Sequence, residues 1–83
     1  GPTWAVHPAA VTINVLGGLD GVDPTLHLGE ALAVEGAHVH LYGKQPKPGR
    51  KLGHVTAFGD DSGQARELAR RAEAALLGRR PFQ

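Results

Sequence analysis

The chain has 83 residues, and its nine Lys and Arg against eight Asp and Glu leave a net charge of +1. This length predicts one small domain with a modest core, and so small a net charge does not favour a general nucleic-acid binder. Cysteine is absent, which excludes disulfides and thiolate zinc sites. The sequence has neither a run of 18 apolar residues nor a secretory signal pattern, so we expect a cytoplasmic protein that makes no membrane contact.

The two ends of the chain suggest a piece of a longer protein. The sequence contains no Met, even at position 1, and Gly1-Pro2 is typical of the scar left by tag removal. Residues 79–83 are expected to form a frayed tail. We therefore predict a single domain over residues 1–83, cut from a larger enzyme.

The first half predicts a strand and a helix. Apolar residues alternate with polar ones up to Leu16, which predicts a half-buried strand that Gly17-Gly18 breaks. Asp23-Pro24 is typical of a helix N-cap followed by proline in the first turn, and Gly36 would end that helix. Its predicted inward face consists of Leu28, Ala31 and Leu32.

The second half predicts a hairpin and a second helix. Residues 37–42 and 52–58 have strand character, and a proline-rich connection joins them. A helix should follow with Asp61 or Ser62 as its N-cap, and Gly78 should stop it. Its apolar stripe consists of Ala65, Leu68, Ala69, Ala72 and Leu76. The predicted fold class is α+β, with a small antiparallel β-sheet covered by two helices.

The connection between the predicted hairpin strands carries a dense group of cations. Four of the nine basic residues fall between positions 44 and 51, here called the basic loop, and no Asp or Glu occurs from Gly36 to Gly59. These four residues are Lys44, Lys47, Arg50 and Lys51. Pro48-Gly49 suits the centre of a tight turn, which would bring Lys47 and Arg50 within about 7 Å. The pattern is consistent with an anion site and equally with a solvated surface loop, and spacing alone does not decide between them.

Three histidines raise the alternative of a metal site. His38 and His40 lie two apart on a strand and share a face, and His54 joins them only if the hairpin register allows it. No nearby carboxylate would orient their rings, so we expect ordinary polar strand residues and no metal.

Catalytic patterns are weak in this chain. The only serine, Ser62, falls at a helix cap, and no nucleotide-phosphate glycine motif is present. We therefore identify no catalytic residue. For nucleic-acid binding, Tyr42 is the single aromatic residue beside the basic loop, so we expect no nucleic-acid partner.

Two motifs resemble a known family. His40-Leu41-Tyr42-Gly43-Lys44 followed by Pro48-Gly49-Arg50-Lys51-Leu52-Gly53-His54-Val55-Thr56 is similar to the C-terminal signature of 5-(carboxyamino)imidazole ribonucleotide synthase, an ATP-grasp ligase of purine biosynthesis. Ile13-Asn14-Val15-Leu16-Gly17 resembles the segment that opens the same C-terminal domain. The resemblance covers nearly the whole chain but only the last fifth to quarter of the family's enzyme.

The resemblance implies a substrate-binding role. Members of this family use ATP, magnesium and bicarbonate to carboxylate 5-aminoimidazole ribonucleotide. Lys44 and Arg50, with Lys51 beside them, would hold the ribonucleotide's 5′-phosphate. Lys47, where the family often has arginine, would support them with His54 and Asn14. The complete enzyme would be a homodimer, and the nucleotide- and magnesium-binding parts would lie in upstream ATP-grasp domains, so this chain alone should bind no cofactor and catalyse nothing.

Two other functions remain consistent with the sequence. An independent phosphoanion- or RNA-binding module would show salt-dependent oligonucleotide binding. A purely structural domain that caps a larger enzyme's active site would tolerate removal of the loop charges.

Overall fold

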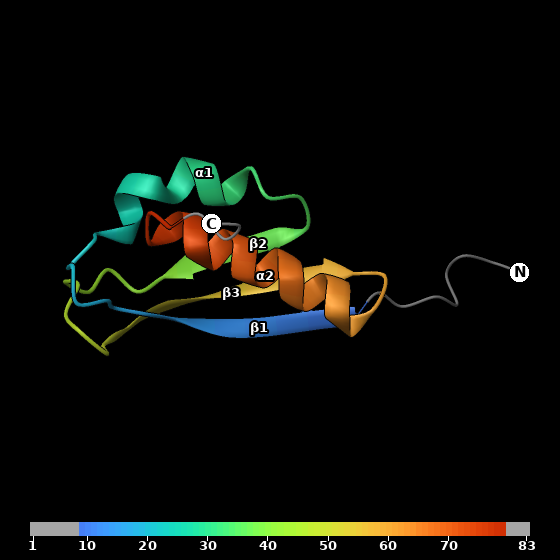
Figure 1. The fold of residues 1–83 in the computed structure, drawn as a ribbon, viewed down its shortest axis with the longest axis horizontal. Coiled ribbons are helices and arrows are strands. Elements are labelled where there is room, and N and C mark those ends of the chain that lie inside the picture. Colours follow the sequence, from blue (N-terminus) through green and yellow to red (C-terminus); the bar gives the residue numbers. More distant parts are fainter. Residues whose placement is uncertain (1–8, 80–83) are drawn as a thin grey trace, which may run out of the picture.

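The computed structural model describes residues 9–79, which form a three-stranded sheet with helices on one face (Figure 1). In chain order the elements are β1 (Ala9–Leu16), the 3-10 helix η2 (Pro24–His27), α1 (Leu28–Leu32), β2 (Ala37–Leu41), β3 (Lys51–Gly59) and α2 (Ser62–Leu76). The strand order is β1-β3-β2, and β3 pairs antiparallel with both neighbours. The predicted α+β class and antiparallel sheet are confirmed.

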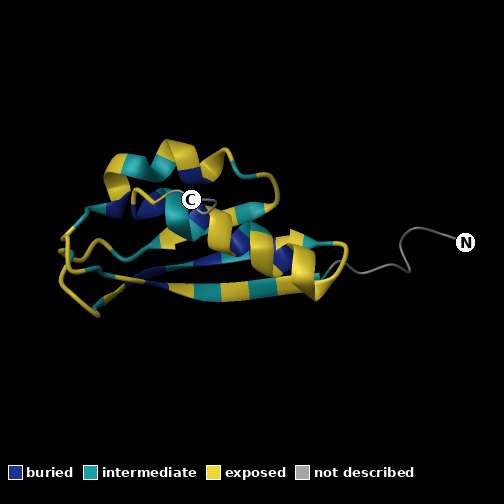
Figure 2. Cartoon of the chain, in the orientation of Figure 1, coloured by how far each residue is buried: buried dark blue, intermediate teal, exposed yellow. Residues whose placement is uncertain are grey.

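The core lies between the sheet and the helices (Figure 2). Its α2 contribution is mostly alanine, and these small side chains allow the helix to pack closely on the central strand. The predicted stripe is buried except for Leu68, which is only half-buried. The buried cluster consists of Val15, Ala31, Leu52, Val55, Ala57, Ala69, Ala72, Leu76 and Leu77.

The first predicted helix was wrong in its extent. Asp23 does cap it, because its side chain accepts a hydrogen bond from Thr25 N at 2.9 Å, but the segment is a 3-10 turn followed by only five α-helical residues. Leu32 is 56% exposed instead of facing the core. Val34 packs against the core from the turn that follows, so the chain leaves the helix before Leu32 can turn inward.

The other element boundaries differ by a few residues. β1 and β3 extend beyond the predicted strands, and β2 ends at Leu41. The α2 N-cap is Asp61 and not Ser62, since the Asp61 carboxylate accepts from Gln64 N at 2.8 Å. In α2, Arg71 Nη2 lies 3.1 Å from Glu67 Oε1, an i,i+4 pair on the helix surface.

Both chain ends carry predictions that fall outside the described residues. Arg79, the first residue of the predicted tail, donates its backbone N–H to Ala74 O at 2.7 Å. The rest of that tail, residues 80–83, and the Gly1-Pro2 scar lie outside residues 9–79.

Candidate functional site

The basic loop contains the predicted tight turn. Arg50 N donates to Lys47 O at 3.0 Å, and Gly49 between them has φ +74°. Proline before a residue with positive φ is the signature of a type II turn, which glycine forms without strain. The turn therefore brings the backbones of Lys47 and Arg50 together, as the sequence predicted.

A second feature holds the loop in place, and the sequence did not reveal it. The residue after β1, Gly17, donates its N–H to Arg50 O at 2.8 Å and accepts from Gly49 N at 2.8 Å. Any side chain at Gly17 would overlap the carbonyl oxygen of Lys47. The sequence indicated only that Gly17-Gly18 breaks a strand. The structure shows that the backbone of Gly17 also forms two hydrogen bonds with the basic loop.

The cations of the basic loop have no acidic partner in the part of the chain that the structure describes. Within residues 9–79, Lys44, Lys47, Arg50 and Lys51 make no ion pair with a carboxylate, and the two ion pairs found lie elsewhere. Arg50 does donate from Nη1 to Gln45 O at 3.2 Å, which steadies the guanidinium while leaving its other N–H groups available. The loop therefore carries four positive charges that no carboxylate among the described residues pairs with.

Two of the predicted supporting residues, Asn14 and His54, lie beside this loop on the helix-free face of the sheet. Asn14 pairs with His54 across β1 and β3, and His54 pairs with His40 across β3 and β2. Lys51 begins β3 opposite Leu16, where the register shifts by one residue in a β-bulge. Asn14, His54 and Lys51 thus lie on one stretch of sheet that leads to the loop.

Tyr42 belongs to the same cluster, although the sequence pattern assigned it no role. Its hydroxyl lies 2.8 Å from His54 Nδ1, and its ring centroid lies 5.4 Å from that of His40. The Lys44 ammonium lies 5.8 Å from the centre of the Tyr42 ring. Strand alternation in the sequence predicts that His40 and Tyr42 share a face, and the register between β2 and β3, which the sequence left open, adds His54 to them.

The same register answers the question about the three histidines. His38, His40 and His54 do share the helix-free face, because their cross-strand partners are in phase. Among residues 9–79, however, no three His, Cys, Asp or Glu side chains form a group that could hold a metal ion. The His38 ring instead meets Phe58 edge-on at 5.5 Å.

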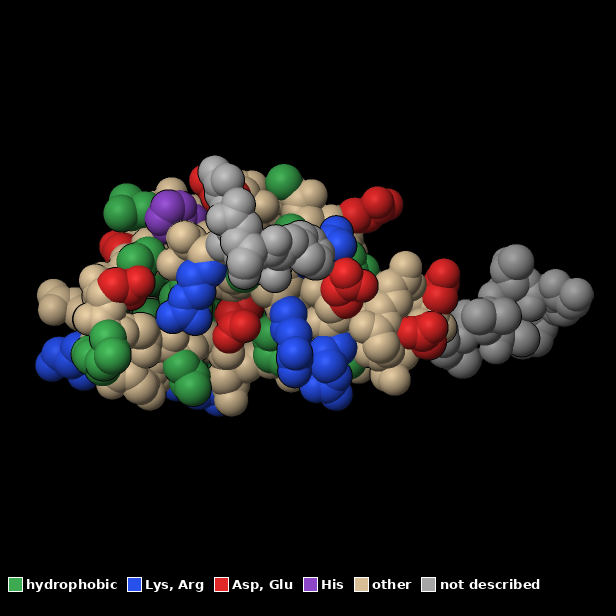
Figure 3. All heavy atoms as spheres, in the orientation of Figure 1, with side chains coloured by type: hydrophobic (Ala, Val, Ile, Leu, Met, Phe, Trp, Pro, Cys, Tyr) green, Lys and Arg blue, Asp and Glu red, His purple; other side chains and the backbone are tan. Residues whose placement is uncertain are grey.

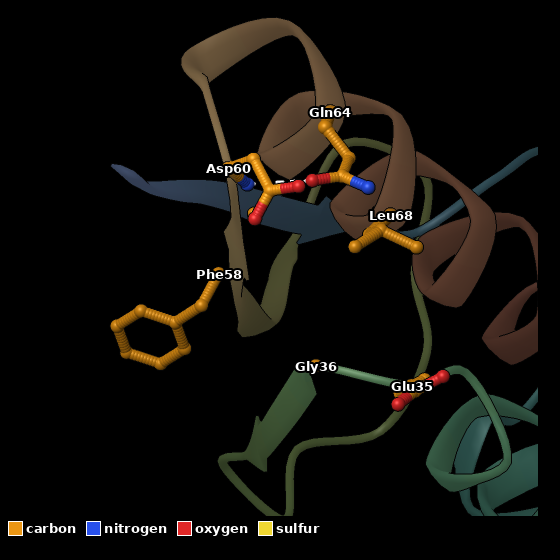
Figure 4. A pocket seen from close by; sticks show the side chains of 7 residues that line it. Glu35, Gly36, Phe58, Asp60, Gln64 and Leu68 are labelled. Atoms are coloured by element: carbon orange, nitrogen blue, oxygen red, sulfur yellow. Dashed lines mark hydrogen bonds between the residues drawn. The ribbon is translucent and has the colours of Figure 1, made fainter. Parts of the chain in front are cut away.

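A pocket of about 360 Å³ lies at the other end of β3 (Figure 4). It is lined by Glu35, Gly36, Phe58, Gly59, Asp60, Gln64 and Leu68. Two hydrogen bonds join lining residues to one another: Gln64 Oε1 accepts from Asp60 N at 2.5 Å, and Phe58 N donates to Gly36 O at 3.0 Å. In Figure 4 the Phe58 ring points away from Gln64 and Leu68, so it does not close the pocket.

The surface charges differ between the two ends of the sheet. Figure 3 shows acidic side chains and no basic ones at the end where β3 leads into α2, whereas the opposite end carries basic side chains together with acidic ones, and further basic side chains lie over α2. No helix within residues 9–79 is long and apolar enough to span a membrane. Because four cations without carboxylate partners among the described residues adjoin the cluster of His40, Tyr42 and His54, the best candidate site is the basic loop with this cluster.

Comparison with a family model identifies what this arrangement resembles. Residues 10–68 match the model described as the phosphoribosylaminoimidazole carboxylase C-terminal domain. Among curated relatives, N5-carboxyaminoimidazole ribonucleotide synthase from Mycobacterium tuberculosis is 44% identical over 79 residues, covering 90% of this chain and 18% of that protein. The Vibrio vulnificus enzyme of the same name is 42% identical over 72 residues, covering 84% of this chain and 17% of that protein.

Solved structures give the same result. N5-carboxyaminoimidazole ribonucleotide synthetase from Thermotoga maritima matches with a TM-score of 0.65 and 38% identity, over 80% of this chain and 19% of that one. The synthase from Aspergillus clavatus, solved in complex with ADP and 5-aminoimidazole ribonucleotide, matches with a TM-score of 0.62 and 32% identity, over 81% and 18%. The present chain thus spans about a fifth of the length of the relatives it matches.

Proposed function

Because the chain belongs to the family of phosphoribosylaminoimidazole carboxylase C-terminal domains, we propose that it is the substrate-binding domain of a ligase that carboxylates 5-aminoimidazole ribonucleotide in purine biosynthesis. Lys44, Arg50 and Lys51 bind the 5′-phosphate of the ribonucleotide, and Lys47, His54 and Asn14 support them. The single observation that carries this assignment is the tethered basic loop, whose four cations lack carboxylate partners among the described residues.

The physical case for a phosphate rests on preorganisation. The type II turn and the two hydrogen bonds to Gly17 fix the loop backbone before any ligand arrives. A ligand then loses little of its binding free energy to ordering the loop. Each charge-assisted hydrogen bond from Lys or Arg to a phosphate contributes about 1.5–3 kcal/mol, which is about ten- to hundredfold in affinity.

The remaining parts of the reaction are assigned to the rest of the proposed enzyme. ATP is the cofactor, in keeping with the ADP-bound and ATP-bound Aspergillus clavatus structures. Magnesium, bicarbonate and a homodimeric, cytoplasmic enzyme complete the proposal. In this proposal the acidic ligands of magnesium belong to upstream ATP-grasp domains.

Steady-state kinetics of the complete ligase that carries this domain test the phosphate role. Replacing Arg50 with alanine should raise KM for the ribonucleotide about ten- to hundredfold and leave KM for ATP nearly unchanged, because only the ribonucleotide loses a phosphate contact. Arg66→Ala is the matched control, since it removes one exposed arginine from α2, away from the loop. Equal effects of Arg50→Ala on both substrates would argue against phosphate anchoring.

The 83-residue chain provides a second arm of the same test. It should show no ATP hydrolysis. Measurable turnover by the pure chain would contradict the proposal that this domain binds substrate while the rest of the enzyme hydrolyses ATP. Salt-dependent binding of oligonucleotides with no preference for sugar phosphates would favour the independent RNA-binding module instead. Unchanged substrate binding after removal of the loop charges would favour the structural capping role.

A further inference from the structure

We infer that Tyr42 is the positioning residue for Lys44, and that His54 fixes Tyr42 in the orientation this task requires. The inference rests on the proposed function, in which Lys44 binds the ribonucleotide phosphate, and deepens it. A lysine on a loop is a flexible cation with a long side chain. The cluster around Tyr42 supplies what holds that side chain in one region of space.

The backbone of Tyr42 is fixed although β2 ends one residue earlier. Its N–H donates to Leu52 O at 2.9 Å, which extends the pairing between the two strands by one bond. The next residue, Gly43, has φ +72°, a conformation that glycine adopts readily and other residues avoid. Lys44 follows this glycine, and its ammonium group lies over the Tyr42 ring.

The ring of Tyr42 is held by two imidazoles. Its hydroxyl and His54 Nδ1 are 2.8 Å apart, and either tautomer of the histidine can complete that hydrogen bond. The His40 ring lies 5.4 Å from the Tyr42 ring and 5.1 Å from the His54 ring, centroid to centroid. The three rings form a closed cluster in which a reorientation of Tyr42 would break contacts with both neighbours.

The face of this fixed ring receives the lysine. The Lys44 ammonium lies 5.8 Å from the ring centroid, within the range of about 6 Å over which a cation is attracted to an aromatic face. No carboxylate within residues 9–79 pairs with Lys44 and draws it elsewhere. The ring therefore orders the ammonium group without neutralising its charge, which leaves that charge for a phosphate.

A double-mutant cycle in the 83-residue chain tests the coupling, with ribose 5-phosphate as the probe and NMR titration as the measurement. Tyr42→Leu removes the aromatic face and should weaken binding about two- to fivefold, the range expected for one exposed cation–π contact. Tyr42→Phe keeps the ring and should cost less. In a Lys44→Ala background, Tyr42→Leu should have no further effect.

The same loss in both backgrounds would overturn the inference, because it would show that Tyr42 supports the fold and not the lysine. A ligand-free readout separates this inference from the proposed function. The Lys44 Hε protons should be shifted upfield by the tyrosine ring in the wild-type chain and in Tyr42→Phe, and should return to ordinary values in Tyr42→Leu.

Random-coil Hε shifts in the wild-type chain would also overturn the inference, whether or not the variants fold. If the upfield shift is present but Lys44→Ala binds ribose 5-phosphate as well as the wild type, the positioning stands and phosphate anchoring by Lys44 fails.

Discussion

The two ends of β3 are built by similar backbone devices but present their polar groups differently. At the basic end, Gly17 forms two backbone hydrogen bonds with the basic loop, and the loop's cations have no carboxylate partner among the described residues. At the acidic end, Gly36 O accepts from Phe58 N, the Asp61 carboxylate accepts from Gln64 N, and the Gln64 amide oxygen accepts from Asp60 N. Backbone hydrogen bonds therefore hold both ends, and the two ends differ in the charge they carry, which is positive at the basic end where the site is proposed.

Glycine-to-alanine substitutions at the two ends should separate structure from binding. Gly17→Ala places a methyl group on the Lys47 carbonyl, so the basic loop must move; we expect a loss of about 1–3 kcal/mol in unfolding free energy together with loss of ribose 5-phosphate binding. Urea denaturation and NMR titration of the 83-residue chain measure the two effects.

Gly36→Ala is the counterpart at the acidic end. Its φ is +81°, and the added methyl carbon would lie 2.9 Å from the Phe58 carbonyl oxygen, so it should be similarly destabilising, yet binding by the folded protein should persist. Gly29→Ala, whose methyl group would meet no atom within 4 Å, is the control without a clash, and it should be slightly stabilising because alanine favours the helix. If Gly17→Ala binds ribose 5-phosphate normally, the two hydrogen bonds between Gly17 and the basic loop do not shape the site.

Removing the α2 cap should sharpen the same contrast with a smaller effect. Asp61→Ala deletes the acceptor for Gln64 N and should lower the unfolding free energy by about 0.5–2 kcal/mol, with no change in sugar-phosphate affinity. Ser62→Ala is the matched control, because Ser62 is the neighbouring residue that the structure does not use as the cap. Equal destabilisation by both variants would contradict the assignment of Asp61.

Local chemistry made much of this molecule predictable. Alternation predicted the three strands, Pro48-Gly49 predicted the turn, and the stripe from Ala65 to Leu76 predicted the inward face of α2. The hydrogen bonds between Gly17 and the basic loop could not be predicted, because they join residues about 30 positions apart and follow a bulge at the end of β1. The contact between Tyr42 and His54 could not be predicted for a similar reason, since only the register between β2 and β3 places His54 within reach of the Tyr42 hydroxyl.

The first helix was misjudged because spacing alone does not set the length of a helix. Leu28, Ala31 and Leu32 have helical spacing, but Gly29 weakens the helix and the segment needs only one turn to bury Ala31. Val34 then supplies the next core contact from outside the helix. Periodicity reports which side chains can share a face, whereas the length of the helix depends on how soon the next core contact is made.

The smallest expected effect concerns Glu73, in the last turns of α2. Burial raises the pKa of this carboxyl, and the positive charges of Arg79 and Arg70 offset the rise only in part. The folded state therefore holds the proton more tightly than the unfolded chain. That contribution to stability is fully present below the ordinary pKa of 4.5 and is lost as the pH rises through the higher folded value.

Wild type and Glu73→Gln should thus have similar urea midpoints at about pH 4, and the wild type should be the less stable of the two at about pH 7. Glu67→Gln serves as the control, because Glu67 is an exposed carboxylate in an i,i+4 pair with Arg71, and its removal should not reproduce this pH dependence. A wild type that gains stability over Glu73→Gln as the pH rises would show that the arginines outweigh burial at this carboxyl.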